Sequence, residues 1–398
     1  MAQSGLSRAR LARMHAVMAG YVERGDIPGL VTLLYRRGEV HADAIGTFGV
    51  GSSTPMQRDT IFRIASMSKP ITAVATLILV EECKLRLDEP VDRWLPELAN
   101  RRVLARLEAD LGDTVPAHRA ITTRDLLTFR FGFGLVLARP GQYPIQAAIA
   151  DAGLAPGPNS PRRTPDEYMK ALGSLPLIAQ PGEKWLYHTG SDVLGVLIER
   201  VSGQSFPSFL AERVFAPLGM KDTAFYVPPE KIHRLPTSYV GSSKPAELLV
   251  ADRGPDGRFS REPLFASGGG GLVSTVDDYL AFCTTLLNKG RAGSQRILSR
   301  PSVELMATDH LTALQKAEAR IFFSDFRGWG FGLAVTTRRG DFGAPGRFGW
   351  DGGAGTSGYT DPAEDLIGVL MTQRMMDSPQ WPKVFSDFWT AAYAAIDD

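Results

Sequence analysis

Ser66 and Lys69 stand three residues apart in the stretch RIASMSKPITAVA, at the first turn of an apolar helical pattern. Positions three apart lie on one face of a helix, so the serine hydroxyl and the lysine amine can touch. A serine is a weak nucleophile until a base takes its proton, and a lysine whose pKa is lowered by burial can help to remove it. A Ser-x-x-Lys also arises by chance about once in a chain of this length, so the pair needs partners.

Two later segments could supply these partners. Tyr187 lies in WLYHTGSDVLG, in a polar turn before a helical pattern. A tyrosine beside a neutral lysine can lose its proton, act as base for the serine, and then act as acid for the leaving group. The glycine-rich stretch RFGWDGGAGTSGYTDP predicts a strand that another segment can approach closely and that offers an N–H to an oxyanion. Taken singly, the tyrosine also fits a core position and the glycines a tight turn.

The pattern of apolar residues predicts the elements that position these residues. LVTLLYRRG and EVHADAIGTFG read as two strands joined in a hairpin at Arg37 and Gly38, and a helix runs from the Ser66 region to Lys84. Further strands are predicted in the last third of the chain, in GWGFGLAVTT, GRFGWDG, GTSGYTDP and DLIGVLMTQ, with a closing helix in SPQWPKVFSDFWTAAYAAIDD. An amphipathic helix is predicted near the N-terminus, with one apolar side made of Leu6, Leu11, Met14, Val17, Met18 and Tyr21.

Strands at both ends of the chain with helices between them predict an α/β (α+β) fold. Residues 1–84 and 266–398 are expected to form one sheet domain, residues 85–265 a mostly helical lobe, and the active site to lie between them. Phe129, Phe131 and Phe133 lie in an irregular part of this lobe and are predicted to pack in the core rather than to contact substrate.

The composition excludes several classes of protein. Hydrophobic residues make up 44% and charged residues 22%, and 44 Lys and Arg against 43 Asp and Glu give a net charge of +1. This balance argues against nucleic acid or a membrane surface as partner. With no apolar run of about 20 residues and no signal-peptide pattern, a cytoplasmic location is expected. Cys83 and Cys283 are predicted to be buried free thiols, and the six histidines have no metal-ligand spacing, so neither metal nor cofactor is expected.

Three motifs in this order resemble those of the serine β-lactamase and penicillin-binding protein superfamily. They are Ser66-Met67-Ser68-Lys69, Trp185-Leu186-Tyr187 and Trp350-Asp351-Gly352. The resemblance is strongest to the family VIII carboxylesterases, which are class C β-lactamase-like serine hydrolases, and it extends over roughly residues 10 to 395. It implies a β-lactamase/DD-peptidase-like fold, with an antiparallel sheet flanked by helices and a mostly helical lobe.

The resemblance also implies a role for each matching residue. Ser66 would be the acylated nucleophile, Lys69 its activating partner, and Tyr187 the general base and acid. The backbone N–H groups of Ser66 and Gly353 would form the oxyanion hole. The triad Trp350, Asp351 and Gly352 would line the substrate groove.

Two departures from the family pattern bear on the substrate. Trp350 stands where β-lactamases and peptidoglycan enzymes carry a lysine that binds a carboxylate, and Thr189 stands where an asparagine is common. Both favour a small-molecule ester, so the leading hypothesis is a carboxylesterase for short-chain acyl esters with weak β-lactam hydrolysis beside it. The alternatives are an acyltransferase of the lovastatin-pathway type, a β-lactamase or D-alanyl-peptidase, and a non-catalytic binding protein. The sequence predicts no oligomeric state.

Overall fold

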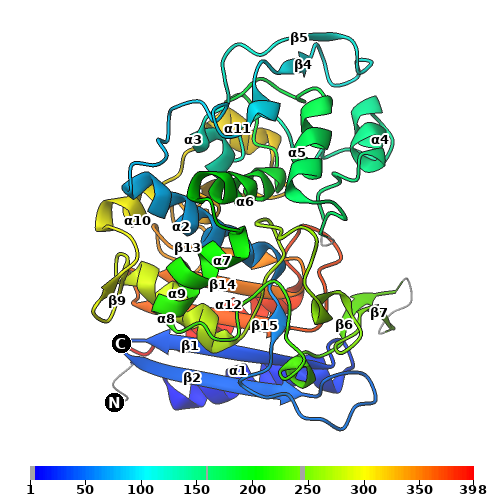
Figure 1. Cartoon of the computed structure of the whole chain (residues 1–398). Coiled ribbons are helices and arrows are strands. Elements are labelled where there is room, and N and C mark those ends of the chain that lie inside the picture. Colours follow the sequence, from blue (N-terminus) through cyan, green and yellow to red (C-terminus); the bar gives the residue numbers. More distant parts are fainter. Residues whose placement is uncertain (1–4, 158–159, 243–246) are drawn as a thin grey trace.

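A central antiparallel sheet is built from both ends of the chain. The structure is a computed structural model that describes residues 5–157, 160–242 and 247–398. Within these residues, seven strands lie in the order β11-β12-β13-β14-β15-β1-β2 (Figure 1). Their bounds are β1 Gly29–Arg36, β2 Glu39–Gly46, β11 Arg327–Trp329, β12 Ala334–Thr336, β13 Phe348–Gly352, β14 Thr356–Asp361 and β15 Leu366–Thr372.

The N-terminal hairpin joins this sheet through β1. The turn between β1 and β2 contains Arg37 at φ 48° and Gly38 at φ 85°, the left-handed conformation that short hairpin turns need. β1 also pairs with β15, with Leu33 opposite Val369. The predicted hairpin and the predicted pairing of the two ends of the chain are therefore confirmed, as is the mixed α/β class.

Helices cover both faces of the sheet because β1 is apolar on both sides. Leu30 and Leu34 pack among side chains of α1 and α12, whereas Val31 and Leu33 belong to a larger core that includes α2 and α9. The bounds of these helices are α1 Arg8–Glu23, α2 Ser68–Glu81, α9 Val276–Leu287 and α12 Lys383–Ala394. Among the described helices, none is both long and apolar enough to cross a membrane.

The remaining helices gather mainly above the sheet, around α6 (Figure 1). Their bounds are α3 Thr123–Leu127, α4 Pro144–Asp151, α5 Pro165–Ser174, α6 Thr189–Ser202, α7 Phe206–Leu210, α8 Ala216–Leu218, α10 Arg300–Met306 and α11 Ala313–Glu318. Short strand pairs are β3 Phe62–Arg63 with β8 Val273–Ser274, β4 Arg102–Leu104 with β5 Thr114–Pro116, β6 Ser238–Gly241 with β7 Leu248–Asp252, and β9 Arg291–Ala292 with β10 Gln295–Arg296. From α11, Gln315 donates to the carbonyls of Gly182 and Glu183 in the lobe. The domain boundaries at residues 84/85 and 265/266 stay predictions.

One predicted strand is broken in the structure. GWGFGLAVTT forms β11 and β12 with a connection between them, because Phe331 leaves the sheet and is fully buried in the core. Gly332 follows at φ 68°, and a Cβ there would lie 2.8 Å from the carbonyl oxygen of Lys69. A single continuous strand was therefore the wrong prediction, and the break brings this loop against the helix that carries Lys69.

The predictions about the burial of individual side chains were partly confirmed. Phe129, Phe131 and Phe133 are fully buried, as predicted, and so is the thiol of Cys283. Cys83 is exposed, because α2 ends before it and its backbone turns left-handed at φ 59°. Val17 is likewise exposed and Leu11 is half-buried, whereas Met14, Met18 and Tyr21 of the predicted apolar side are buried, as is Leu6, which lies before α1.

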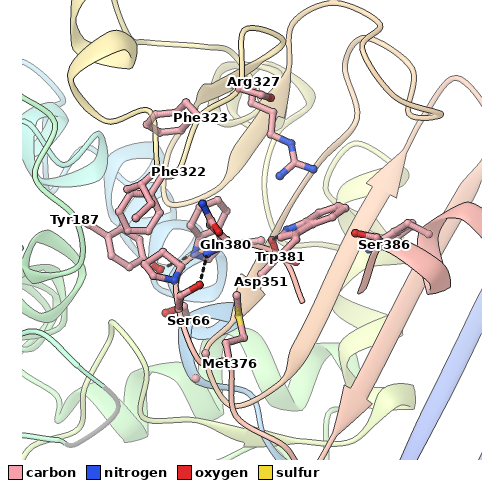
Figure 2. A pocket seen from close by; sticks show the side chains of 18 of the residues that line it. Ser66, Tyr187, Phe322, Phe323, Arg327, Asp351, Met376, Gln380, Trp381 and Ser386 are labelled. Atoms are coloured by element: carbon pink, nitrogen blue, oxygen red, sulfur yellow. Dashed lines mark hydrogen bonds between the residues drawn. The ribbon is translucent and has the colours of Figure 1, made fainter. Parts of the chain in front are cut away.

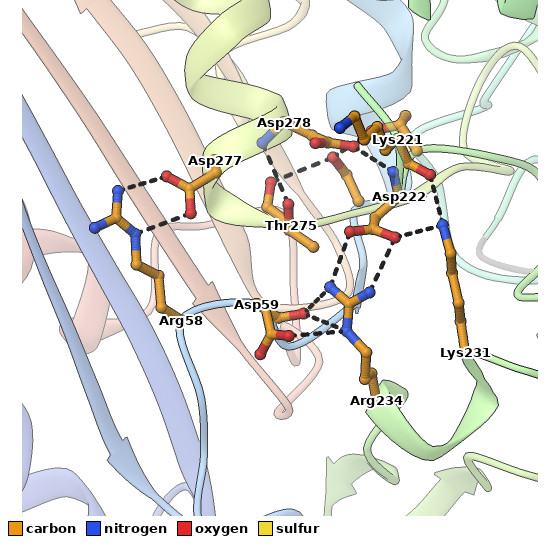
Figure 3. A network of polar contacts seen from close by, with 11 residues as sticks. Arg58, Asp59, Lys221, Asp222, Lys231, Arg234, Thr275, Asp277 and Asp278 are labelled. Atoms are coloured by element: carbon orange, nitrogen blue, oxygen red, sulfur yellow. Dashed lines mark hydrogen bonds and ion pairs between the residues drawn. The ribbon is translucent and has the colours of Figure 1, made fainter. Parts of the chain in front are cut away.

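A polar network ties the segment before β3 to the chain around residue 230 and to the start of α9 (Figure 3). The Arg234 guanidinium donates to both carboxylate oxygens of Asp222, at 3.0 and 2.9 Å, and lies 3.2 Å from a carboxylate oxygen of Asp59. Both Arg234 and Asp222 are 17% exposed. Arg58 forms a similar two-bond pair with Asp277, but these two side chains are 52% and 44% exposed.

We expect Arg234→Ala to lower the free energy of unfolding by about 2–3 kcal/mol, because it leaves the Asp222 carboxylate largely buried without its main partner. The matched Arg58→Ala variant should cost less than about 1 kcal/mol, since its ion pair is solvated. Urea unfolding of both variants measures the difference. Equal losses would contradict the assignment of Arg234 as a stabilising link.

Candidate active site

Ser66 lies in a single 3₁₀ turn, η1 (Ala65–Met67), that leads directly into α2. The residue before it, Ala65, has φ 42°, a backbone conformation that non-glycine residues adopt at a cost. Lys69 lies in the first turn of α2, and its Nζ is 2.9 Å from the Ser66 Oγ. The structure therefore brings together the two residues whose spacing first indicated a site.

The Lys69 amine has two further partners, and neither was predicted. Its Nζ lies 2.5 Å from the carbonyl oxygen of Gly269 and 3.2 Å from Nδ1 of His188. His188 Nε2 is 3.2 Å from a carboxylate oxygen of Asp192, so Nε2 carries the proton and Nδ1 is free to accept. A neutral Lys69 amine can give its two N–H groups to Gly269 and His188. Its lone pair then remains for the Ser66 hydroxyl.

Burial of these groups sets their protonation. Complete burial lowers the pKa of Lys69 to about 7, against the opposing effect of the Asp192 charge. Burial also lowers the pKa of His188, with the nearby Lys69 adding to the effect. Burial alone would raise the pKa of Asp192, but His188, Ser267 and the Gly269 N–H outweigh it, and the pKa is lowered. At neutral pH a large fraction of Lys69 is therefore uncharged next to an ionised Asp192 and a neutral His188.

Tyr187 is the third side chain at this site. Its hydroxyl accepts a bond of 2.7 Å from Nε1 of Trp350 and lies close enough to Ser66 for that hydroxyl to lower its pKa. Its ring packs against Trp185 and Phe322, with centroids 5.4 and 4.7 Å away. Burial raises the pKa of Tyr187 above its ordinary value, so the hydroxyl keeps its proton at neutral pH.

The Trp350–Gly353 segment forms the wall opposite Ser66. β12 pairs with β13 only at Phe348 and Gly349, so the rest of β13 has a free edge. A Cβ on Gly352 would lie 2.2 Å from the Ile64 carbonyl oxygen, and glycine therefore permits this strand to approach η1. Gly353 borders the same cavity as Ser66, and a Cβ there would meet nothing within 4 Å. Space for a substrate carbonyl thus exists beside its backbone.

Asp351 borders the cavity, but other side chains already occupy its carboxylate. It accepts hydrogen bonds from Ser357 at 2.6 Å, Tyr359 at 2.9 Å and Trp381 at 2.6 Å. These bonds hold Trp381 across the opening, where Figure 2 shows its indole beside Asp351. Asp351 therefore shapes the cavity wall mainly by positioning Trp381.

The cavity has a volume of about 790 Å³ and runs from Ser66 and Tyr187 past Trp350 to the side of α12. Phe322 and Phe323 close it on one side and Met376 on the other, and Gln380 also lines it (Figure 2). The walls near Ser66 are mostly apolar and aromatic. In the described parts of the chain, no three histidine, cysteine or carboxylate side chains converge as metal ligands.

Sequence reasoning missed His188 and Asp192. They follow the tyrosine motif directly and stand four residues apart, so at the start of α6 they share one face. This spacing of four residues could have indicated from the sequence that His188 and Asp192 interact. The resemblance singled out Thr189, but its buried hydroxyl has no hydrogen-bond partner among the described residues. The residue of this motif that contacts Lys69 is instead His188.

Comparison with known proteins agrees with this geometry. Residues 14–383 match the Beta-lactamase family. The chain is 38% identical to protein Rv1367c of Mycobacterium tuberculosis over 89% of this chain and 88% of the relative. It is 30% identical to esterase EstB of Burkholderia gladioli over 93% of this chain and 92% of the relative. The solved structure of EstCE1, described as a hydrolase with promiscuous acyltransferase activity, has a TM-score of 0.80 at 28% identity, covering 97% of this chain and 99% of that chain.

The fold and the family match together define a serine-hydrolase-type enzyme with a β-lactamase-like fold. The chain belongs to the Beta-lactamase family, as the sequence motifs predicted. Its esterase relatives make it a serine-hydrolase-type enzyme.

Proposed function

We propose that the protein is a carboxylesterase that cleaves acyl esters, short-chain esters among them, through an acyl-enzyme on Ser66. The observation that carries this proposal is the convergence of two hydrogen-bonded pairs, Lys69 with Ser66 and Trp350 with Tyr187, at one end of a largely apolar cavity. These pairs bring a nucleophile, a base of suitable pKa and a proton donor to one point.

In the proposed acylation step, the neutral Lys69 amine accepts the Ser66 proton as Oγ attacks the ester carbonyl carbon. The backbone N–H groups of Ser66 and Gly353 stabilise the oxyanion. Tyr187 then gives its proton to the departing alcohol oxygen, and the proton held by Lys69 restores the tyrosine. The net result is that the serine proton leaves with the alcohol and Ser66 becomes an ester.

This assignment modifies the hypothesis drawn from the resemblance, in which Tyr187 was the base. The raised pKa of Tyr187 favours its protonated form, whereas the pKa of Lys69, about 7, suits a base near neutrality. In deacylation the same groups would take a proton from water as it attacks the acyl carbon. They would then return a proton to the Ser66 Oγ.

Trp350 supports esters over β-lactams and D-alanyl peptides as substrates. Its indole N–H is committed to Tyr187, and a neutral indole offers no ion pair to the carboxylate that those substrates carry close to the scissile bond. The test is a panel of esters with increasing acyl length, assayed beside a chromogenic cephalosporin and a D-alanyl peptide. Ester turnover with little turnover of the other two is expected, and a preference for the peptide or the cephalosporin would overturn the proposal.

Acyl transfer is a second candidate, favoured by the similarity to EstCE1. In that reaction an alcohol replaces water in the second step and leaves with the acyl group. Hydrolysis of one ester in the presence of increasing concentrations of a competing alcohol separates the two. Formation of a new ester in proportion to the alcohol would establish transfer, and exclusive release of free acid would exclude it.

The pH dependence tests the role of Lys69. Since the neutral amine is the active form, kcat/KM should rise with pH and level off above an apparent pKa of about 7. Two pH units below that pKa, only about 1% of the amine is neutral, so the rate should be about 100-fold below the plateau. A profile that is flat from pH 5 to pH 8 would contradict the assignment.

The direction in which the pH–rate profile shifts in an Asp192→Asn variant is a sharper test of the role of Lys69. The Asp192 charge raises the pKa of Lys69, so removing the charge should lower that pKa further. The acid limb of the variant should then move to lower pH, even though its plateau rate falls because the His188 bond is weakened. Movement of the limb to higher pH would show that another group controls it.

A further inference from the structure

Two arginine side chains border the end of the cavity away from Ser66. The Arg327 guanidinium extends toward Trp381 (Figure 2), with its Cζ 4.2 Å from the indole centre. Among the described residues its ion-pair contact is Asp341 at 3.8 Å, which is longer than a hydrogen bond. Its N–H donors are therefore directed at the cavity rather than at a close protein acceptor.

Arg347 is the second cation, and it is 2% exposed. Its guanidinium lies between the rings of Tyr359 and Trp389, with Cζ 4.3 and 4.1 Å from their centres. Its Nε and Nη2 have no hydrogen-bond partner among the described residues. Because these two nitrogens are enclosed by protein atoms, Arg347 contributes mainly its buried positive charge to this end of the cavity, and that charge favours an anion there.

The carboxylates around this end already accept hydrogen bonds. Asp351 accepts from Ser357, Tyr359 and Trp381, and Asp341 accepts from the Gly343 N–H. Asp361 accepts from Tyr393 and the Ala344 N–H, and Asp377 accepts from Arg374. None of these carboxylates lies within hydrogen-bonding distance of the Arg327 guanidinium, so its donors are left for a ligand. Ser386 of α12 lines the same end and adds a hydroxyl group (Figure 2). A carboxylate matches such a set, because its two oxygens fit the fork of a guanidinium.

The strand β13 sets the distance between the two ends of the cavity. Arg347 immediately precedes the strand and Gly353 immediately follows it. Six residues of extended chain at about 3.3 Å each separate their Cα atoms by about 20 Å. The Arg347 end of the cavity is therefore far from the ester carbonyl, whereas the carboxylate of a β-lactam lies close to its scissile bond.

We propose that this end of the cavity is an anion subsite that binds a terminal carboxylate on the acyl or the alcohol part of the substrate. The inference rests on the proposed esterase function and names its substrate class. The preferred substrate is a long, mainly apolar ester that carries a carboxylate at its tip. The aromatic walls bind the chain, Arg327 binds the carboxylate, and the buried charge of Arg347 adds to the attraction.

Matched substrates test the subsite. One series consists of monomethyl esters of α,ω-dicarboxylic acids, and each is compared with the methyl ester of a fatty acid of equal length. The other consists of O-acetyl ω-hydroxy acids compared with alkyl acetates, which distinguishes the alcohol side from the acyl side. The ratio of kcat/KM for the charged ester to that for the neutral one should rise with length to at least about 10-fold, mainly through KM. A ratio of one or less at every length in both series would overturn the subsite.

Arginine variants test whether the ratio of kcat/KM for charged and neutral esters depends on Arg327 and Arg347. Arg327→Gln should lower it about 10- to 100-fold, and Arg327→Lys, which keeps the charge but loses the fork, should lower it less. Arg338→Gln is the control, since Arg338 is 60% exposed and lies outside the cavity lining. An unchanged ratio in Arg327→Gln would refute the assignment. Arg347→Gln also removes buried stacking, so the Arg327 variants decide the result.

Binding to the inactive Ser66→Ala protein separates failure of the subsite from failure of the esterase proposal. Calorimetry with the monomethyl dicarboxylates and their neutral partners measures affinity without turnover. Tighter binding of the charged ester by Ser66→Ala, lost in the added Arg327→Gln change, would support the subsite even if no ester were hydrolysed. Turnover of neutral esters with no advantage from the carboxylate would support the esterase and refute the subsite.

Discussion

Ser66→Ala should reduce kcat/KM for ester hydrolysis by at least about 10⁴-fold, because it removes the hydroxyl that lies against the Lys69 amine. The Ser66 Oγ lies beside Lys69 and Tyr187, and the substitution leaves these two side chains and the helix in place. The melting temperature should therefore stay close to that of the parent protein. Hydrolysis rates and thermal unfolding measure the two effects.

Ser68→Ala is the matched control within the same motif. The Ser68 hydroxyl donates to the Ala65 carbonyl at 2.7 Å and accepts from the Leu272 N–H at 3.2 Å, so it supports the turn that carries the nucleophile. This variant should lose stability but keep most of its hydrolysis. A fluorophosphonate should label the parent protein on Ser66, and mass spectrometry that found the label on another serine would refute the assignment.

Tyr187→Phe should lower kcat by about 10²- to 10⁴-fold, the usual range for a lost general acid or base. The variant keeps the ring that packs against Trp185 and Phe322, so little loss of stability is expected. It removes the hydroxyl that lies beside Ser66 and accepts from Trp350. Steady-state and single-turnover kinetics measure the effect on each step.

The leaving group provides a control for this role. If Tyr187 protonates the departing alkoxide, the defect of Tyr187→Phe should be largest for alkyl esters, whose alcohols are poor leaving groups. It should be smaller for nitrophenyl esters, which leave without a proton. An equal defect for both classes would indicate that the hydroxyl positions Ser66 instead of donating a proton.

Sequence reasoning succeeded where the signal is local or repeats a family motif. The Ser66–Lys69 contact follows from a spacing of three residues, and the hairpin at Arg37 and Gly38 from turn chemistry. The short apolar segments at both ends of the chain were sufficient to predict that these ends form one sheet.

The parts of the fold and the site that were not predicted depend on contacts between distant segments, which no local sequence pattern encodes. His188 reaches Lys69 across 119 residues, and the approach depends on how α6 packs beside α2. GWGFGLAVTT has a strand-like composition throughout, yet burial of Phe331 in the core breaks it. Arg327 and Arg347 look like ordinary surface arginines in the sequence, and only the packing around Trp381 and Trp389 brings them to the cavity.

The pairing of β1 with β15 has a consequence for the order of events during protein synthesis. The two strands are separated by about 330 residues, and a ribosome adds roughly 5–20 residues per second. The apolar residues of β1 must therefore wait on the order of half a minute for their partner strand. During that interval one edge of β1 has no partner strand, and Leu30, Val31, Leu33 and Leu34 have not yet reached the cores in which they end up buried.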